Sequence, residues 1–361
     1  MAYQTSLRNG PAFSLLSLLR NVLAMNQPHF APGYVISVLL AIGLAAACSA
    51  DTGTLTLDDD GFAEVFSTGD GDIDATRGMT PGSGTAGTAA TGSDRTTLVG
   101  EIGFFSAPQD IFCPHFDTKP DLDDVHAQAA VGSVIAHPDI SGIDVFAVAG
   151  AYGTQDGTFI ESFSVMELAF PGNWTSTTGD GYSWDAATDA SAARMKAALE
   201  RGGDVWIAEA GQSDFSHDAI QKVIVAMPGV DTRRFHIVQH SDWNEEVTTQ
   251  SKLDWLRANV DYIHIEDGNF PNSTPDFKTF PEEIAATEIA LWDQVQGHPT
   301  LGPLWTEAKR IADEYNPVSA YNNTAIEAGG FDFSDGAETT HIFGYQNDIN
   351  DHADFFSIFV P

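Results

Sequence analysis

Residues 111–124, IFCPHFDTKPDLDD, join an apolar run of strand length to four carboxylates within eight positions. The four are Asp117, Asp121, Asp123 and Asp124. Cys113 lies inside the apolar run, which indicates a buried small side chain rather than a nucleophile. Like charges this close repel one another, and burial of an unpaired carboxylate is costly. The stretch therefore predicts a strand that ends where water, a metal ion or a substrate offsets the charge.

The alternation of strand and helix continues along the chain. Apolar runs of strand length occupy 111–117, 142–149, 204–210, 235–239 and 261–265. Stretches with helical character occupy 122–136, 187–201, 215–226, 248–258 and 303–314. Repeated units of this kind predict an α/β domain with a Rossmann-like, mostly parallel sheet and helices on both faces. In such folds the ligand site lies at the carboxyl ends of the strands.

An apolar segment precedes this domain. Residues 34–47, YVISVLLAIGLAAA, are too short to span a bilayer comfortably and fit the apolar core of a secretory signal. The AAAC that ends at Cys48 resembles a bacterial lipoprotein processing site, in which the cysteine is lipidated. A short uncleaved anchor is the alternative, and Met25 is an alternative start to Met1. We expect 1–48 to direct the protein to the bacterial cell envelope, in the periplasm or at the cell surface, with a lipid anchor as its contact with the membrane.

Charge limits the partners of the mature chain. Removal of 1–47 removes Arg8 and Arg20 and no acids, which leaves 14 Lys and Arg against 51 Asp and Glu, a formal charge of −37. That charge argues against nucleic acid and anionic membrane surfaces as partners. Residues 49–97 are rich in Asp, Gly, Thr and Ser, so we expect a flexible acidic tether. Residues 98–361 are enough for one large domain.

Capping and metal binding are the two main interpretations of the acids after the first strand. Asp123 and Asp124 open a predicted helix, where free N–H groups and partial positive charge favour carboxylates. Capping explains two acids and leaves the other two, whereas Ca²⁺ takes six to eight oxygen ligands. Lys119 and Leu122 exclude an EF-hand loop, which needs an oxygen ligand and a glycine at those positions. Lys119 also stands where a phosphatase-type D-x-D needs its second Asp.

DTKPDLDD resembles the calcium-binding signature of nucleoside hydrolases, D-x-D-P-G-x-D-D. It is closer to the D-x-G-N-D-P-D-D motif in the nucleoside hydrolase-like domain of bacterial cellulose-binding proteins. Asp117, Asp123 and Asp124 match the first motif, from which Lys119 and Asp121 depart. Asp121 matches the second motif. The resemblance implies a nucleoside hydrolase-like fold, with Ca²⁺ held by Asp117, Asp121 and Asp124. It implies Asp123 as the general base that acts on the attacking water.

The next two strand ends extend the resemblance. FAVAGAYG, 146–153, corresponds to a stretch whose Asn helps to bind the sugar in nucleoside hydrolases, and Ala151 stands in its place. This departure weakens any expectation of ribose recognition. WIAEAGQSDF, 206–215, resembles a loop in which a backbone carbonyl completes the calcium shell, which implies Gln212 as that ligand. Glu209 is either a substrate-binding acid of the same region or a strand-end acid that faces water.

The fourth strand leads to QHSDWNEE, 239–246, which resembles the E-x-N pair that binds sugar in nucleoside hydrolases. Asp242 and Asn244 take those places, and the resemblance implies that they bind substrate. His240 is either a general acid that contacts substrate or a hydrogen-bonded loop histidine. Trp243 either stacks on a sugar ring or base or packs in the core.

A final stretch near the C-terminus, GGFDFSDGAETTHIFG, 329–344, resembles a segment of the cellulose-binding relatives. That segment supplies a distant calcium-ligating Asp, which implies Asp335 as a ligand here. Asp332 is the competitor, and a turn Asp that caps the following helix is the alternative. The resemblance spans roughly 110–345, with its motifs in the same order along the chain.

These features favour a calcium-dependent hydrolase of an N- or O-glycosidic bond that acts on a small sugar or nucleoside-like substrate. One alternative is a calcium-loaded surface protein that binds carbohydrate without turnover. Another is a domain whose acids are mainly an adaptation to salt. The sequence leaves the sugar and the leaving group open. Nucleoside hydrolases often form oligomers, whereas a tethered lipoprotein need not, so the oligomeric state is open as well.

Overall fold

The computed structural model describes residues 54–57, 63–66, 100–269, 275–279 and 286–361. The chain divides into two compact units, Met1–Thr80 and Pro81–Pro361. In the first unit, β1 (Thr54–Leu57) pairs antiparallel with β2 (Ala63–Phe66), a hairpin inside the stretch that we expected to be a tether. The predicted signal segment, Cys48 and the rest of the tether lie outside the described residues.

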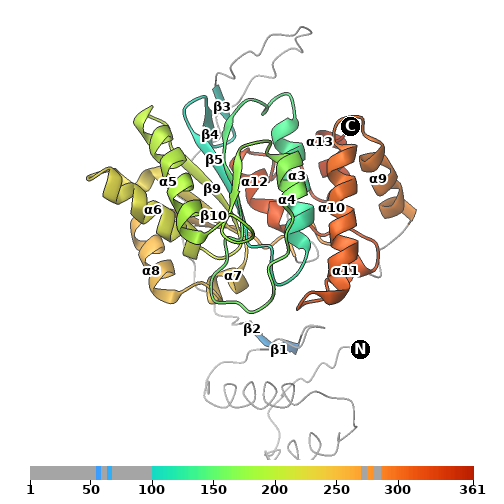
Figure 1. The fold of residues 1–361 in the computed structure, drawn as a ribbon. Helices are drawn as coiled ribbons and strands as arrows, with labels where there is room; N and C mark the ends of the chain where they lie inside the picture. The colour runs from blue at the N-terminus through green and yellow to red at the C-terminus, as the bar shows by residue number, and fades with distance from the viewer. Residues whose placement is uncertain (1–53, 58–62, 67–99, 270–274, 280–285) are drawn as a thin grey trace, which may run out of the picture. The chain divides into compact units, whose positions relative to one another are not determined.

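The second unit is built on a seven-stranded sheet in which neighbouring strands pair in parallel (Figure 1). Its strands are β5 (Ile111–Phe116), β6 (Asp144–Val145), β7 (Ala147–Ala149), β8 (Trp174–Ser176), β9 (Val205–Ala210), β10 (Phe235–Gln239) and β11 (Asp261–His264). Their order is β11-β10-β9-β5-β7-β8, and β6 also pairs with β5. A two-stranded antiparallel sheet joins β3 (Gly100–Ile102) and β4 (Phe105–Ala107).

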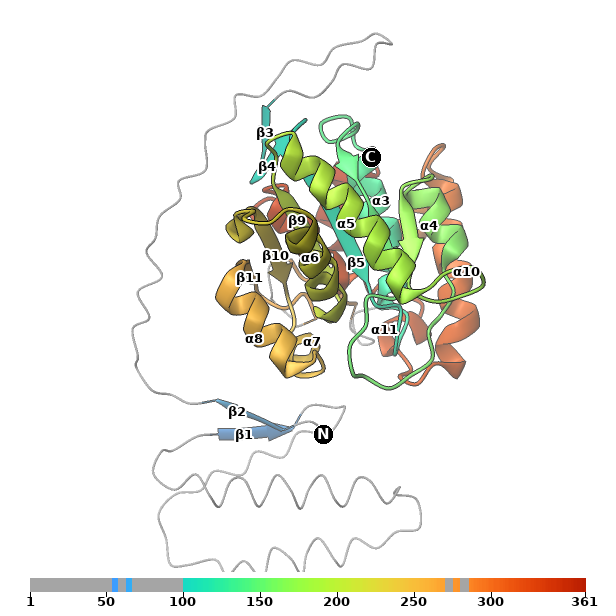
Figure 2. The same ribbon diagram turned by 60° about the vertical axis from the view of Figure 1, so that its left-hand side comes forward.

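Helices cover both faces of this sheet, and Figure 2 shows α5 and α6 side by side over one of them. That face carries α5 (Trp184–Glu200), α6 (Asp214–Ala226) and α8 (Gln250–Asn259). The other side carries α3 (Asp123–Ala136), α4 (Phe163–Ala169), α9 (Ala286–Gly297), α10 (Gly302–Tyr315), α11 (Thr324–Glu327), α12 (Ala337–Ile342) and α13 (His352–Phe359). The remaining short elements are α7 (Asp242–Glu246), η1 (Thr232–Arg234), η3 (Asn316–Val318) and η4 (Ser334–Gly336).

The residue pattern of β5 explains its central position. Phe112 and Phe116 pack into the apolar cluster that contains α3 and α10. Ile111 and Cys113 pack into the cluster that contains α5 and α6. Successive strand residues face opposite sides of a sheet, so a strand covered on both faces is apolar throughout. Every residue of β5 is buried, which follows from this pattern.

Pro114 accounts for the interruption between β6 and β7. Phe112 O accepts a hydrogen bond from Phe146 N at 2.9 Å, so the even-numbered residues of β5 turn their backbone groups toward this neighbour. Pro114 has no N–H to donate on that side. The pairing with β5 therefore stops after Val145 and resumes at Val148.

The strand order fixes where a ligand site belongs. From β5 the chain first adds β7 and β8 on one side, and then crosses to add β9, β10 and β11 on the other. Such a reversal leaves a crevice outside the carboxyl ends of the strands at which it occurs. Those strands are β5 and β9, and the residues that follow them are Asp117 and Gly211.

The predicted fold class is confirmed, and the predicted strands and helices are present with ends that differ by a few residues. The sequence did not predict β8, α4, α9, α12 or α13, and of these β8 and α12 are too short to show a periodicity. Cys113 is buried, as expected. Among the described residues, none of the helices combines the length and the apolar character that crossing a membrane requires.

Candidate metal centre

The loop after β5 contains a strained turn. Thr118 has a φ of 53°, in the left-handed region that a β-branched residue rarely adopts. Its N–H donates to Asp124 Oδ2 at 2.5 Å, and its carbonyl accepts from Ile160 N at 3.0 Å. Strained backbone of this kind clusters at functional sites. Here the turn brings Asp124, at the start of α3, back toward Asp117.

Asp117 is buried against two amide side chains. Gln212 Nε2 and Gln155 Nε2 donate to Asp117 Oδ2 at 2.9 and 3.0 Å. Lys119 N donates to Asp117 Oδ1 at 2.9 Å. Only glycine allows this approach of β9 to β5, because a Cβ on Gly211 would lie 2.7 Å from Asp117 Cβ. Gln212 thus meets Asp117 through its side chain, whereas the resemblance implied its backbone carbonyl as a ligand.

Asp123, Asp124 and Asp335 form a group that we call the acidic triad. Each offers a carboxylate oxygen, and these oxygens lie within 4.8 Å of one another. Asp335 comes from η4, far along the chain from the two acids of α3. Asp124 Oδ1 is buried, and no donor in the described part of the chain reaches it. The triad could hold a metal ion, which would satisfy this oxygen.

Burial raises the pKa of these acids. It raises the pKa of Asp117 to about 6, against the opposing effect of a hydrogen bond shared with Asp124. The pKa values of the three triad carboxyls lie well above the ordinary value, first because of burial and next because of neighbouring carboxylates. Without a cation, these groups need protons to remain so close together. A bound divalent cation would offset the same repulsion.

Asp121 and Asp332, which we call the distal acids, lie beside the triad. Asn323 Nδ2 donates to both, at 3.4 Å to Asp121 Oδ2 and at 2.7 Å to Asp332 Oδ2. Lys278 Nζ lies 3.7 Å from Asp332 Oδ2. Burial raises the pKa of Asp121 to about 6, with a hydrogen bond to Asp123 and the charge of Lys278 acting against it. Asp121 and Asp332 therefore share the side-chain amide of Asn323 as a hydrogen-bond donor.

His240 links Asp335 to another buried acid. Its Nδ1 is hydrogen-bonded to Glu338 Oε1, and its Nε2 lies 3.3 Å from Asp335 Oδ1 and 4.0 Å from Asp267 Oδ1. Burial alone would lower the pKa of His240, but Glu338 and then Asp267 outweigh it and raise the pKa to about 9. The ring is therefore positively charged at neutral pH. A general acid must contact substrate, which a side chain 1% exposed does not offer.

Asn244 is the residue of α7 that reaches this network. Its Oδ1 accepts from Gln212 Nε2 at 2.9 Å, and its Nδ2 donates to Gln239 Oε1 at 3.3 Å. Because Gln212 also contacts Asp117, one side chain separates Asn244 from the acids. Trp243, in the same short helix, is half-buried.

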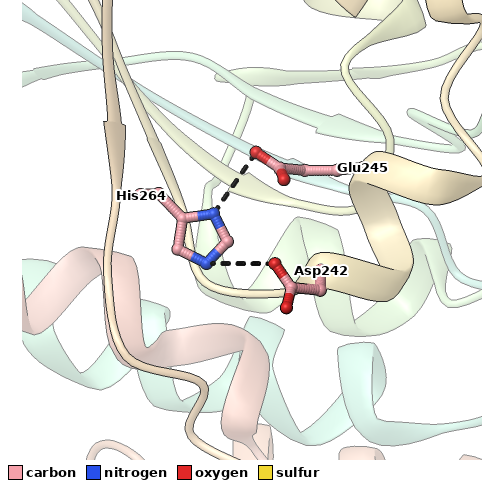
Figure 3. A group of neighbouring side chains, drawn as sticks. All are labelled: Asp242, Glu245 and His264. Carbon is pink, nitrogen blue, oxygen red and sulfur yellow. Dashed lines mark ion pairs between the residues drawn. The ribbon is translucent and has the colours of Figure 1, made fainter. Parts of the chain in front are cut away.

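Asp242 belongs to a different group, which Figure 3 shows. His264 Nε2 lies 3.7 Å from Asp242 Oδ1, and His264 Nδ1 lies 3.3 Å from Glu245 Oε1. These three residues also bring ligand atoms within 4.8 Å of one another. The ring turns one nitrogen to each carboxylate, however, which is the arrangement of an ion-paired histidine. Asp242 is 89% exposed, and no contact among the described residues joins it to the acidic triad.

Glu209 lies in the core under α6. Its Oε1 is 3.5 Å from His115 Nδ1, and Ser216 Oγ donates to its Oε2. His115 Nδ1 and Ser216 Oγ are themselves 2.9 Å apart. All three residues are fully buried, and burial raises the pKa of Glu209. Glu209 therefore does not face water, and none of its contacts in the described structure is with the acidic triad.

The structure gives the contacts of Ala151 and Lys119, two positions that differ from the nucleoside hydrolase pattern. Ala151 is fully buried in the apolar cluster with α5 and α6, and its carbonyl accepts from Gln212 N at 3.2 Å. The place of the sugar-binding Asn thus offers no polar side chain. Lys119 Nζ lies 4.0 Å from the centre of the Tyr152 ring and donates to Gln155 O at 3.2 Å.

Sequence reasoning missed four residues that contact either the acids or His240. These are Gln155, Lys278, Asn323 and Glu338. Most come from loops that no local pattern connects to the acidic stretch. Glu338 could have been predicted from its spacing. It follows Asp335 by three residues, which places both side chains on one side of a helical turn.

Comparison with known proteins identifies no family for this chain. No family model matches the chain, and no curated protein sequence matches it. Buried carboxylates meet at the carboxyl end of the central strand, where they could hold a metal ion.

Proposed function

We propose that this chain is a calcium-dependent hydrolase of an N- or O-glycosidic bond, carried on a lipoprotein of the bacterial cell envelope. One observation carries the proposal: Asp335 meets Asp123 and Asp124 beside the end of β5. That position is where a sheet of this topology binds its ligands. Asp335 is also the distant aspartate that the resemblance to nucleoside hydrolases implies as a calcium ligand.

The donor chemistry favours Ca²⁺ over softer ions. The triad offers carboxylate oxygens within 4.8 Å of one another, and Asp117 adds the carboxylate that neighbours Asp124. Hard cations prefer such ligands, and Ca²⁺ accepts many of them in flexible geometry. Asp117, Asp124 and Asp335 would be the main ligands, with Asp121 and Gln212 at the border of the shell. When bound, the ion would supply positive charge that orients sugar hydroxyls and acidifies water.

Asp123 is the proton acceptor in this proposal. Its Oδ1 accepts from Asp124 N at 2.9 Å, so its carboxylate is fixed at the first turn of α3. A carboxylate there would take the proton of the water that attacks the anomeric carbon, through an oxocarbenium-like transition state. Asn244 would help to position the sugar through the network that it forms with Gln212.

A carbohydrate-binding protein without turnover is the second candidate, and Ala151 favours it. The resemblance assigns sugar binding to an Asn at this position, and the alanine here is buried in the core. The exposed Asp242 favours it as well, because its partner is His264 rather than the acids. Such a protein would keep the calcium site and lack sugar release.

The test is release of free sugar by the purified full chain from a panel of ribosides and small glycosides, with and without a calcium chelator. We expect chelator-sensitive release, and the reactive substrate identifies the leaving group. Calcium binding without release from any substrate would instead support the carbohydrate-binding protein.

Asp123→Asn tests the base directly. We expect sugar release to fall by about 10²- to 10⁴-fold, because a positioned base contributes that much. Asp139→Asn is the control, since Asp139 follows the same helix and is 76% exposed. Full turnover by Asp123→Asn would overturn the mechanism.

The lipid anchor has its own test: mass spectrometry should find Cys48 as the modified first residue.

A further inference from the structure

His240 is a buried link between the end of β10 and Asp335. Gln239 Oε1 accepts the backbone N–H of His240 at 2.9 Å, which fixes the chain where the strand ends. The ring then contacts a carboxylate at each nitrogen: Glu338 at Nδ1, and Asp335 at Nε2. A side chain this buried acts on the site through its neighbours rather than on a substrate.

Asp335 and Glu338 are arranged to hold the ring between them. Asp335 lies in η4 and Glu338 in the first turn of α12, three residues apart, so both side chains share one side of the turn. Glu338 is completely buried, and its Oε2 has no hydrogen-bond partner among the described residues. Loss of the ring would leave this carboxylate without its partner in the core, which is costly.

We propose that His240, held by Glu338, is the positioning residue that fixes Asp335 for metal binding. The inference rests on the proposed metal site. A carboxylate has two oxygens, so the contact of Nε2 with Asp335 Oδ1 leaves the other oxygen for a cation. A side chain fixed in advance loses less conformational entropy when the ion binds. Residues that orient metal ligands in this way typically change affinity by about 10- to 100-fold when they are removed.

The test is a calcium titration of the full chain by isothermal titration calorimetry. His240→Asn keeps a polar atom near the Nδ1 position and loses the one that reaches Asp335, whereas His240→Gln keeps a donor near the Nε2 position. We expect His240→Asn to weaken calcium binding by about 10- to 100-fold and His240→Gln to recover most of the affinity. A merely structural role would not distinguish the two amides in this order.

A double substitution identifies the carboxylate through which His240 acts. In an Asp335→Asn chain, His240→Asn should cause no further loss of calcium affinity, because its target is already gone. The matched control is His115→Asn, since His115 is equally buried and is paired with Glu209 rather than with the triad. It should leave the affinity within about twofold.

The outcomes separate the two proposals. If His240→Asn does not fold, Glu338→Gln has the same size and should weaken calcium binding in the same direction. Equal affinity in the wild type and in these variants would overturn the positioning role alone. No calcium binding by the wild-type chain would overturn the proposed function and the positioning role with it.

Discussion

Two buried histidine–glutamate pairs lie on opposite faces of the central sheet. His115 and Glu209 meet under α6, where Ser216 Oγ contacts both. His240 and Glu338 meet under α12, and His240 also lies 3.3 Å from Asp335. The residue types are the same in both pairs. The first pair ends in the core, whereas the second reaches a carboxylate of the acidic triad.

The two pairs have the same residue types and are equally buried, so what distinguishes them is contact with a metal-ligand candidate. His240 contacts Asp335, whereas His115 contacts no carboxylate of the triad in the described structure. His115 and Glu209 join β5 to β9 through their 3.5 Å contact and through Ser216 Oγ, and none of these contacts involves the triad. The same two residue types beside an unsatisfied group of carboxylates can orient a ligand. Substitutions that remove the contact with Asp335 should therefore lower calcium affinity, whereas substitutions at His115 should lower stability alone.

The largest effect should come from Asp335→Asn, which removes the carboxylate that makes the two pairs different. We expect calcium affinity to fall by at least about 100-fold, because the site loses both a ligand and a negative charge. Calorimetry with the full chain measures this loss. Asp332→Asn is the comparison, because Asp332 is a distal acid. If Asp332→Asn lowered calcium affinity more than Asp335→Asn does, Asp332 rather than Asp335 would be the ligand.

An intermediate effect, on stability alone, should follow from His115→Asn. The change removes the buried ring nitrogen that contacts Ser216 Oγ and Glu209 Oε1, which should lower the free energy of unfolding by about 1–3 kcal/mol. Urea denaturation in the presence of a chelator measures the change. A loss of calcium affinity as large as that of His240→Asn would mean that the two pairs do not differ as described.

The smallest effect concerns pH and Glu209. Burial raises the pKa of Glu209 above 4.5, so the folded chain binds this proton more tightly than the unfolded chain does. The free energy of unfolding therefore decreases as pH rises from that value toward the raised pKa of the folded state. Glu209→Gln removes this contribution, so its stability relative to the wild type should improve as pH rises above about 4.5. Parallel pH curves for the two proteins, measured by urea denaturation with a chelator, would contradict the expected sign.

Much of the fold could be predicted because its strands are local patterns. The run in IFCPHF is apolar except at His115, and its six residues are buried in a strand covered on both faces. Asp117 and Asp124 could be expected together, since a short loop joins the strand to the helix. The three-residue strand β8 and the short helix α12 were not predicted, because they contain too few residues to show a period.

The outer part of the candidate site could not be predicted from local patterns. Asp335 follows no strand of the sheet, so a family resemblance rather than periodicity suggested it. Lys278 and Asn323 reach the distal acids from segments whose position depends on the packing of the whole domain. Glu209 occupies a strand end, as polar site residues do, yet its side chain turns to α6. The direction of a side chain at a strand end is set by the pleat, which residue type alone does not reveal.

Thermal unfolding of the wild-type chain in Ca²⁺, in Mg²⁺ and in chelator tests the central claim most directly. A cation that binds only the folded state stabilises it by about 2.7 kcal/mol at a hundred times its dissociation constant. We predict that Ca²⁺ raises the midpoint of thermal unfolding by about 5 °C or more and that Mg²⁺ raises it less. The same midpoint in all three conditions would contradict a calcium site among Asp117, Asp124 and Asp335.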